Sequence, residues 1–268
     1  MAAGALAGIG AAAVVSGDEA TSFHCHACGR CCNSPPAMTV AELFHHEDRF
    51  VGSLCVARGT APGTLALWTQ GHDYPSLAAC PARLDDGRCG VHDDGKPAQC
   101  RAVPLDPRRP EAAQAAVLVQ RRRDAAFMAA DCLVAGEEPG LKDAAFAPLV
   151  RGAHIVDAGY RADFLHCRDA QDADAARWRD AVLALLRPAL ATLPPPRPGG
   201  WLALPLVPVL QVLASQDAER CRRHAQRQVA LIEANVARAL ARRRAEDRGF
   251  TEELRRFAAH YRRWLAAG

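Results

Sequence analysis

The sequence predicts a mainly α-helical protein with a small, irregular cysteine-rich module that contains one β-hairpin. Three observations lead to this class. Cysteines gather in two segments of the first half, a hairpin-turn signal lies inside the second of these segments, and the second half carries apolar residues at helical spacing between arginines. We expect a poorly ordered tail at 1–20, a cysteine-cluster domain at 21–135 and a helical region at 136–268 with a hinge at 193–200.

The first cysteine segment places four thiols within eight residues: Cys25, Cys28, Cys31 and Cys32. Two cysteines separated by two residues can turn both sulfurs toward one soft metal ion. Gly29 lets the loop fold back tightly, because glycine tolerates a positive φ. Cysteines this close are rarely used for packing, so we expect a metal site rather than a disulfide knot or unligated thiols.

A short helix and a strand are expected after this loop. Thr39 and Glu42 match a capping box, which predicts a helix that runs to about Phe50. Cys55 lies among apolar residues and is expected to be a buried thiol. Residues 64–68 are expected to form a short strand.

The second cysteine segment surrounds a turn. Asp86-Gly87 is a hairpin signal that would bring Leu84 and Cys89 onto adjacent arms. The cysteines of this segment are Cys80, Cys89 and Cys100, which share one site with the first set or form a second site beside it. Arg101 is expected to neutralise the thiolates or to pair with Asp85 or Asp93, with a solvated arginine as the alternative.

Further helices follow. One is predicted over 105–131, with Val117, Val119, Phe127 and Met128 buried, and Cys132 after it is the candidate eighth ligand. Cys167 and Cys221 are isolated and are expected to be packing thiols. Helices are also predicted over 173–187, ended by Pro188, over 211–248, ended by Gly249, and from a Thr251 cap onward. The long helix should bury Ala225, Val229, Ile232, Val236 and Leu240.

Composition limits the function classes. An odd number of cysteines, eleven, fits poorly with a disulfide-bonded secreted protein, so we expect a reducing, cytoplasmic setting. Residues 1–15 are apolar but are too short to cross a membrane as a helix. The net charge of +3 does not argue for nucleic acid. The arginine runs 220–223 and 242–244 are expected to be solvated helix faces.

The two cysteine segments resemble the YkgJ family, described as zinc- or iron-chelating domain proteins. The matching residues are Phe23, Cys25, Cys28, Gly29, Cys31, Cys32, Thr39, Glu42, Leu43, Cys80, Leu84, Gly87, Cys89, Pro97, Cys100, Arg101 and Pro104. Lys96 stands where the family usually has arginine, and Cys132 matches a further cysteine that members often carry. Some members are labelled iron–sulfur oxidoreductases, and a related cluster occurs in flagellin lysine N-methylases.

Three functions remain open. The first is a protein that binds an iron–sulfur cluster or zinc through these cysteines, and the sulfur count favours iron–sulfur. His24, His26 and His92 are substitute ligands. The second is an enzyme that uses the cluster, either an oxidoreductase or a protein-lysine N-methylase, although no dinucleotide loop or P-loop is present. The third is a zinc-stabilised adaptor that binds RNA or protein through the arginine-rich helices, which can also form a homo-oligomer surface.

Overall fold

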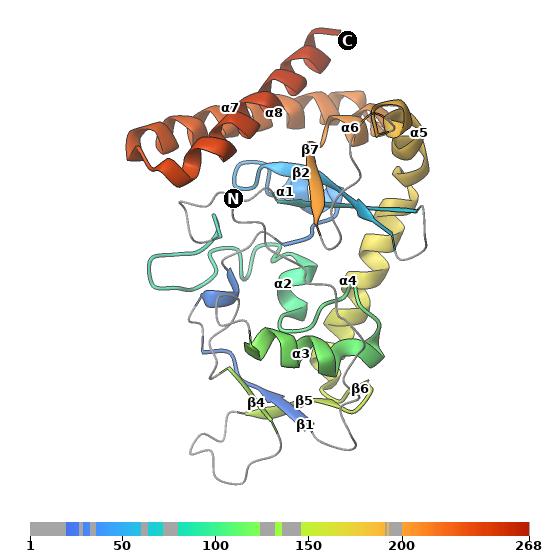
Figure 1. The fold of residues 1–268 in the computed structure, drawn as a ribbon, viewed down its shortest axis with the longest axis vertical. Helices are drawn as coiled ribbons and strands as arrows, with labels where there is room; N and C mark the ends of the chain where they lie inside the picture. Colours follow the sequence, from blue (N-terminus) through green and yellow to red (C-terminus); the bar gives the residue numbers. More distant parts are fainter. Residues whose placement is uncertain are drawn as a thin grey trace. The chain divides into compact units, whose positions relative to one another are not determined.

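The computed structural model describes residues 20–26, 29–32, 36–59, 64–71, 80–123, 132–135, 146–190, 192 and 200–267. These residues form helices and two small antiparallel sheets, which confirms the mainly α-helical class (Figure 1). They divide into two compact units. The first unit contains the described residues of 37–81 and 171–267, and the second contains those of 20–36 and 82–170. The predicted boundary at 135/136 differs from this division, in which each unit uses two separate stretches of chain.

The first unit is built on a three-stranded sheet in the order β3-β2-β7, with all pairs antiparallel. Its strands are β2 (Gly52–Arg58), β3 (Leu65–Gly71) and β7 (Trp201–Pro205). Its helices are α1 (Val40–His45), α5 (Arg179–Leu190), α6 (Val207–Leu213), α7 (Ala218–Arg242) and α8 (Arg248–Ala267). Helix α4 (Ala158–Ala176) begins in the second unit and ends in the first. Cys55 lies on the central strand and is fully buried, as predicted.

The capping box at the start of α1 is present. The Glu42 backbone N–H donates to Thr39 Oγ1 at 3.2 Å, and the Thr39 N–H donates to Glu42 Oε2 at 2.8 Å. These two bonds satisfy donors that a helix start leaves without intrahelical partners. The helix ends at His45, earlier than the predicted Phe50.

A glutamine of α7 holds the segment between α1 and β2. Gln228 is fully buried and accepts a hydrogen bond from the Gly52 N–H at 2.8 Å. Its amide nitrogen donates to the carbonyl oxygens of Glu47 and Phe50 at 3.0 and 3.2 Å. A buried backbone group without a partner is costly, so this one side chain determines where three backbone groups of the connection lie.

A buried histidine lies one turn before Gln228. His224 is fully buried, its ring is 4.3 Å from the Phe44 ring, and its Nδ1 is 3.0 Å from Glu47 Oε2. Burial and the charge of Arg220 lower the pKa of His224 to about 3. The neutral imidazole therefore donates its Nδ1–H to Glu47, which also pairs with Arg227 at 3.0 Å. Periodicity alone did not indicate this cluster.

The helices of the C-terminal half begin and end at different residues from those predicted. The expected helix over 211–248 is two helices, because Asp217 caps α7 by accepting from the Arg220 N–H at 3.0 Å. Helix α7 ends at Arg242, and the capping residue Arg243 adopts a left-handed φ of 54°, so the predicted end at Gly249 was wrong. Thr251 is a buried residue inside α8 rather than its cap.

Other details of these helices also differ. Pro188 lies inside α5 and does not end the helix, and Leu240 of α7 is exposed, with Ala239 buried instead. Strand β7 was not predicted, and most of the expected hinge lies outside the described residues. The predicted strand over 64–68 corresponds to β3.

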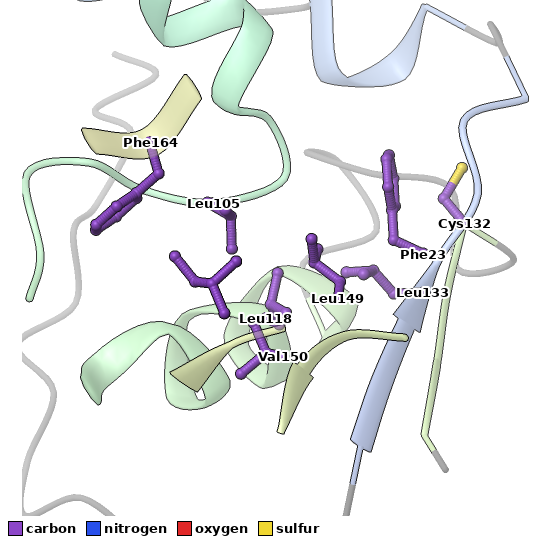
Figure 2. Packing of buried hydrophobic residues seen from close by; sticks show 9 residues of the cluster. Phe23, Leu105, Leu118, Cys132, Leu133, Leu149, Val150 and Phe164 are labelled. Carbon is purple, nitrogen blue, oxygen red and sulfur yellow. The ribbon is translucent and has the colours of Figure 1, made fainter. Parts of the chain in front are cut away.

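The second unit has a four-stranded sheet in the order β4-β1-β5-β6. Its strands are β1 (Ala20–Phe23), β4 (Leu133–Ala135), β5 (Ala147–Arg151) and β6 (His154–Ile155), and its short helices are η1 (Arg30–Cys32), α2 (Ala98–Ala102), η3 (Glu111–Ala113) and α3 (Gln114–Arg123). Its core joins residues of β1, β4 and β5 to residues of the helices (Figure 2). The members are Phe23, Leu105, Leu118, Cys132, Leu133, Leu149, Val150, Ile155 and Phe164.

The predictions for two isolated cysteines and for the apolar positions of α3 have clear outcomes. Cys167 is fully buried, as expected of a packing thiol, and in the first unit Cys221 is 1% exposed. Val117 is buried in α3, whereas Phe127 and Met128 lie outside the described residues.

Within the part of the chain that the structure describes, no helix is both long enough and apolar enough to cross a bilayer.

Removal of the α1 cap should destabilise the first unit alone. Thr39→Ala is expected to lower its free energy of unfolding by about 1 kcal/mol, because the Thr39 hydroxyl no longer accepts from the Glu42 N–H or donates to Glu42 Oε2. All four tryptophans lie at positions of this unit, so urea unfolding followed by tryptophan fluorescence reports on it. Thr192→Ala is the matched control, since that hydroxyl makes one exposed bond to the Ala189 carbonyl. Equal midpoints for the two variants would contradict the role of the cap.

The buried histidine should make the first unit sensitive to acid. The folded-state pKa of His224, about 3, lies below its ordinary value of 6.5. The unfolded state therefore takes up the proton first, so this contribution to stability is complete above pH 6.5 and declines as the pH falls. Between about pH 7.5 and 5 the wild type should lose about 2 kcal/mol more than His224→Gln, measured by tryptophan fluorescence in urea. The control is His166→Gln, at an exposed position of the second unit, which should keep the wild-type dependence of the first unit. Parallel pH profiles for wild type and His224→Gln would refute this prediction.

Candidate metal centre

Strand β1 leads directly into the first cysteine segment. It pairs with β4 from Thr21↔Ala135 to Phe23↔Leu133, and the ladder continues with a 3.1 Å bond from the His24 N–H to the Cys132 carbonyl oxygen. Cys132, far away in sequence, therefore lies opposite the residue before Cys25. The Cys25 side chain is exposed, whereas Cys132 is 4% exposed and belongs to the core of the unit.

The loop turns back at Gly29, as the sequence predicted. Gly29 has a φ of +71°, and its carbonyl accepts a bond from the Cys32 N–H at 3.0 Å. A Cβ on residue 29 would lie 2.4 Å from Arg83 Nε and 2.7 Å from Arg83 Cζ. The guanidinium of Arg83 thus lies directly against the backbone between the two pairs of cysteines, and the positive φ of residue 29 favours glycine there.

The same arginine connects the loop to the second cysteine segment. Arg83 forms an isolated antiparallel bridge with Cys89, and the Gly90 N–H donates to the Ala82 carbonyl at 2.7 Å. The predicted turn is present, since the Leu84 N–H donates to the Arg88 carbonyl at 2.8 Å. Its arms pair only through this bridge and form no extended strands among the described residues. The Cys89 hairpin and the Cys31–Cys32 loop therefore meet at Arg83.

The pKa of the Cys32 thiol is strongly perturbed. A hydrogen bond from Cys31 lowers its pKa most, burial opposes this, and the charges of Lys96 and Arg83 lower it further, so the pKa falls from 9.0 to about 6. A thiolate, not a thiol, binds metals and reacts with electrophiles. Cys32 is therefore mostly ionised at neutral pH.

Cys31 lies between this polar region and the core. It packs against the core of the unit, beside Tyr160, whose ring is 5.7 Å from that of Phe23 in an edge-on contact. Burial raises the pKa of Tyr160 to about 12, and the charges of Cys25 and Cys31 add to this. Both cysteines thus lie within electrostatic range of one phenol.

A half-buried arginine of α3, Arg121, lies within electrostatic range of Cys31. Burial lowers the pKa of Arg121 to about 10, while the charges of Asp106 and Cys31 raise it. Its guanidinium donates to the carbonyl oxygens of Pro104 and, at 3.1 Å, Leu105. The guanidinium therefore remains charged at neutral pH and adds a positive charge near the cysteine loop.

Arg101 anchors the segment that carries Lys96. It lies on α2 beside Cys100, pairs with Asp163 of α4 at 3.3 Å, and donates to the Lys96 carbonyl at 2.8 Å. The acidic partner is therefore Asp163, not the predicted Asp85 or Asp93. This bond holds the backbone of a residue whose charge acts on Cys32.

Several predicted ligands are not brought together in the described residues. Cys28 lies outside them, and Cys80 belongs to the first unit. Cys89 and Cys100 are half-buried in the second unit. Across the described ranges, no group of three or more cysteine, histidine, aspartate or glutamate side chains is arranged to hold a metal ion.

The substitute histidine ligands have other neighbours. The rings of His24 and His26 meet edge-on at 4.6 Å, and both contact Phe146 at 5.7 and 5.9 Å. His92 is exposed, beyond the bridge at Cys89. None of these contacts assigns a histidine to a metal.

The comparisons with known proteins identify no relative. No family model, no curated protein and no solved structure matches the chain. The resemblance to the YkgJ family therefore rests on the motif residues alone.

The sequence did not indicate two contributors to this site. Arg83 lies within the second cysteine segment but outside the positions that define the motif, and Tyr160 is distant from both segments. In the sequence, the only indication that Arg83 contributes to the site is its position three residues after Cys80. Tyr160 gave no local signal, because it reaches the loop only through the fold of the unit.

The ionisation of Cys32 can be tested directly on metal-free protein. Its rate of alkylation by iodoacetamide should rise with a midpoint near pH 6, whereas an ordinary thiol has its midpoint near 9. Peptide mass spectrometry would assign the rates. Arg83→Gln should move the midpoint upward, and Arg88→Gln, at an exposed arginine of the same hairpin, should leave it unchanged. A wild-type midpoint above pH 8 would contradict the assignment.

Proposed function

We propose that the second unit binds a metal centre, an iron–sulfur cluster or zinc, through cysteine thiolates of the two cysteine segments and of Cys132. The loop provides Cys25, Cys28, Cys31 and Cys32, and the remaining ligands come from Cys89, Cys100 and Cys132. Cys28 enters the proposal by its sequence spacing. Cys80 was also predicted, but it lies in the first unit, so the proposal rests on the other seven cysteines.

The main support is the electrostatic setting of Cys32. Its pKa of about 6 keeps the sulfur ionised at neutral pH, as metal binding requires. The pKa of a buried packing thiol shifts in the opposite direction. At Cys221, for example, burial raises the pKa. The loop thus differs in charge state from a cysteine used only for packing.

The positive charges around the loop fit a thiolate-rich centre. Each ligating thiolate adds a negative charge, and a set of four exceeds the charge of one Zn²⁺. Arg83 and Lys96 act on Cys32, and Arg121 acts on Cys31. These cations reduce the repulsion between thiolates that a bound metal only partly neutralises.

We favour an iron–sulfur cluster over zinc. The seven cysteines are more than one tetrahedral site takes, and neighbouring sulfurs such as Cys31 and Cys32 suit a multinuclear cluster better than a spaced zinc knuckle. When bound, such a cluster would supply one-electron chemistry. The resemblance to the YkgJ family supports either metal, and the absence of a disulfide between any two described cysteines fits the proposed reducing cytoplasm.

Anaerobic purification with elemental analysis and a visible absorption spectrum tests the proposal. Brown protein with iron and labile sulfide supports the cluster, and colourless protein with stoichiometric zinc supports the zinc site. Protein that binds neither metal after reconstitution with ferrous iron and sulfide, or with zinc, would reject both.

Substitutions can locate the ligands. Cys31→Ser is expected to lose most of the metal and to lower the melting temperature of the second unit, since metal binding contributes about 10 kcal/mol or more to folding in small cysteine sites. Cys167→Ala is the matched control, because it removes a fully buried thiol of the same unit. Metal content and circular dichroism would be measured on both. Equal metal content in the two variants would count against the loop as the site.

A further inference from the structure

The solvent-facing side of α8 carries a stripe of arginines. Positions seven apart return to nearly the same side of a helix, because an α-helix has 3.6 residues per turn. The arginines lie at such spacings and are all exposed: Arg248, Arg255, Arg256, Arg262 and Arg263. From the first to the last, the stripe is about 22 Å long at 1.5 Å per residue.

The opposite side of the helix is fully used in packing. Leu254 and Tyr261 are 0% exposed and Phe257 is 3% exposed. Tyr261 also donates to the Gly52 carbonyl at 3.4 Å and accepts from the Leu206 N–H at 3.2 Å, which fixes the rotation of the helix. The arginine stripe must therefore face away from the core of the first unit.

Carboxylates neutralise this stripe only in part. Arg256 interacts electrostatically with Glu253, and the exposed Glu252 lies one turn from both Arg248 and Arg256. Arg262 pairs with Glu233 of α7. The structure records no ion pair to a described carboxylate for Arg248, Arg255, Arg256 or Arg263. The arginine runs noted in the sequence differ, since Arg223 and Arg244 pair with Glu219 and Glu246 at 3.6 and 3.5 Å.

Positive charge is concentrated in this helix pair. Residues 218–267 contain thirteen arginines, no lysine and six carboxylates, a net charge of +7 in a chain whose total is +3. The rest of the chain is therefore net negative. This uneven distribution of charge creates a positive local potential that attracts a polyanion. The small net charge of the whole chain does not reveal this potential.

We propose that the exposed face of α8 binds double-stranded DNA through its phosphate backbone. One guanidinium group can donate two parallel hydrogen bonds to the oxygens of one phosphate. The stripe spans the length of about a dozen duplex phosphates, at one charge per about 1.7 Å. The small residue Ala259 lies between the arginine pairs, so the helix can approach the duplex closely. Contacts to phosphate oxygens carry no sequence information directly, so we expect this binding to be independent of sequence.

Other polyanions fit this face less well. An amphipathic helix enters a membrane with its apolar side, which α8 buries in the first unit. Single strands stack on aromatic side chains, and the stripe has none. The major groove of B-form DNA accommodates an α-helix, whereas that of A-form RNA is too narrow.

Fluorescence anisotropy of a labelled DNA duplex, titrated with the full chain, tests this proposal. Five phosphate contacts predict a slope of about −4.5 for log affinity against log salt, which is about a 500-fold loss between about 50 and 200 mM salt. Arg255→Glu with Arg256→Glu should weaken binding at about 50 mM salt by tenfold or more and flatten the slope by about 2.

The control is a double variant with the same change of charge on another helix, α3. Arg122→Glu with Arg123→Glu alters an adjacent pair of exposed arginines on α3 and should leave binding within about twofold of wild type. Circular dichroism would verify that both double variants fold. Absence of duplex binding at low salt, equal losses in the two variants, or stronger binding to phosphatidylserine vesicles, RNA duplex or single strands would each overturn the proposal.

Discussion

The contact between the Arg83 guanidinium and the backbone of Gly29 is the constraint on which the proposed centre depends. It joins the first cysteine segment to the hairpin of the second, and it brings a positive charge to Cys32. The sheet that carries β1 and the pairing of His24 with Cys132 supply the rigid base from which the loop projects.

Local chemistry made some features predictable from the sequence. A capping box uses bonds between residues three apart, so Thr39 and Glu42 indicated the start of α1 without knowledge of the fold. The positive φ of Gly29 and the turn at Asp86-Gly87 are likewise local. Isolated cysteines among apolar residues, such as Cys55 and Cys167, were correctly expected in the core.

Features that depend on distant partners could not be predicted in this way. Strand β7 forms because it pairs with β2, about 150 residues earlier, and its short apolar sequence alone fits several structures. The break before α7 lies inside a stretch of continuous helical periodicity, and only the cap at Asp217 marks it. For the candidate site, the sequence supplied the cysteines, but the partner of Arg101 and the positions of Arg83 and Tyr160 require the fold.

The interleaving of the two units along the chain has a consequence for synthesis. The second unit needs residues on both sides of 37–81, and the first needs residues on both sides of 82–170. Domains usually fold in order as they leave the ribosome. Here, the early strands β2 and β3 must wait for β7 and α7, so their apolar faces stay uncovered while most of the chain is made. Such a nascent chain should depend on chaperones, and a single cut between residues 81 and 82 would leave neither unit complete.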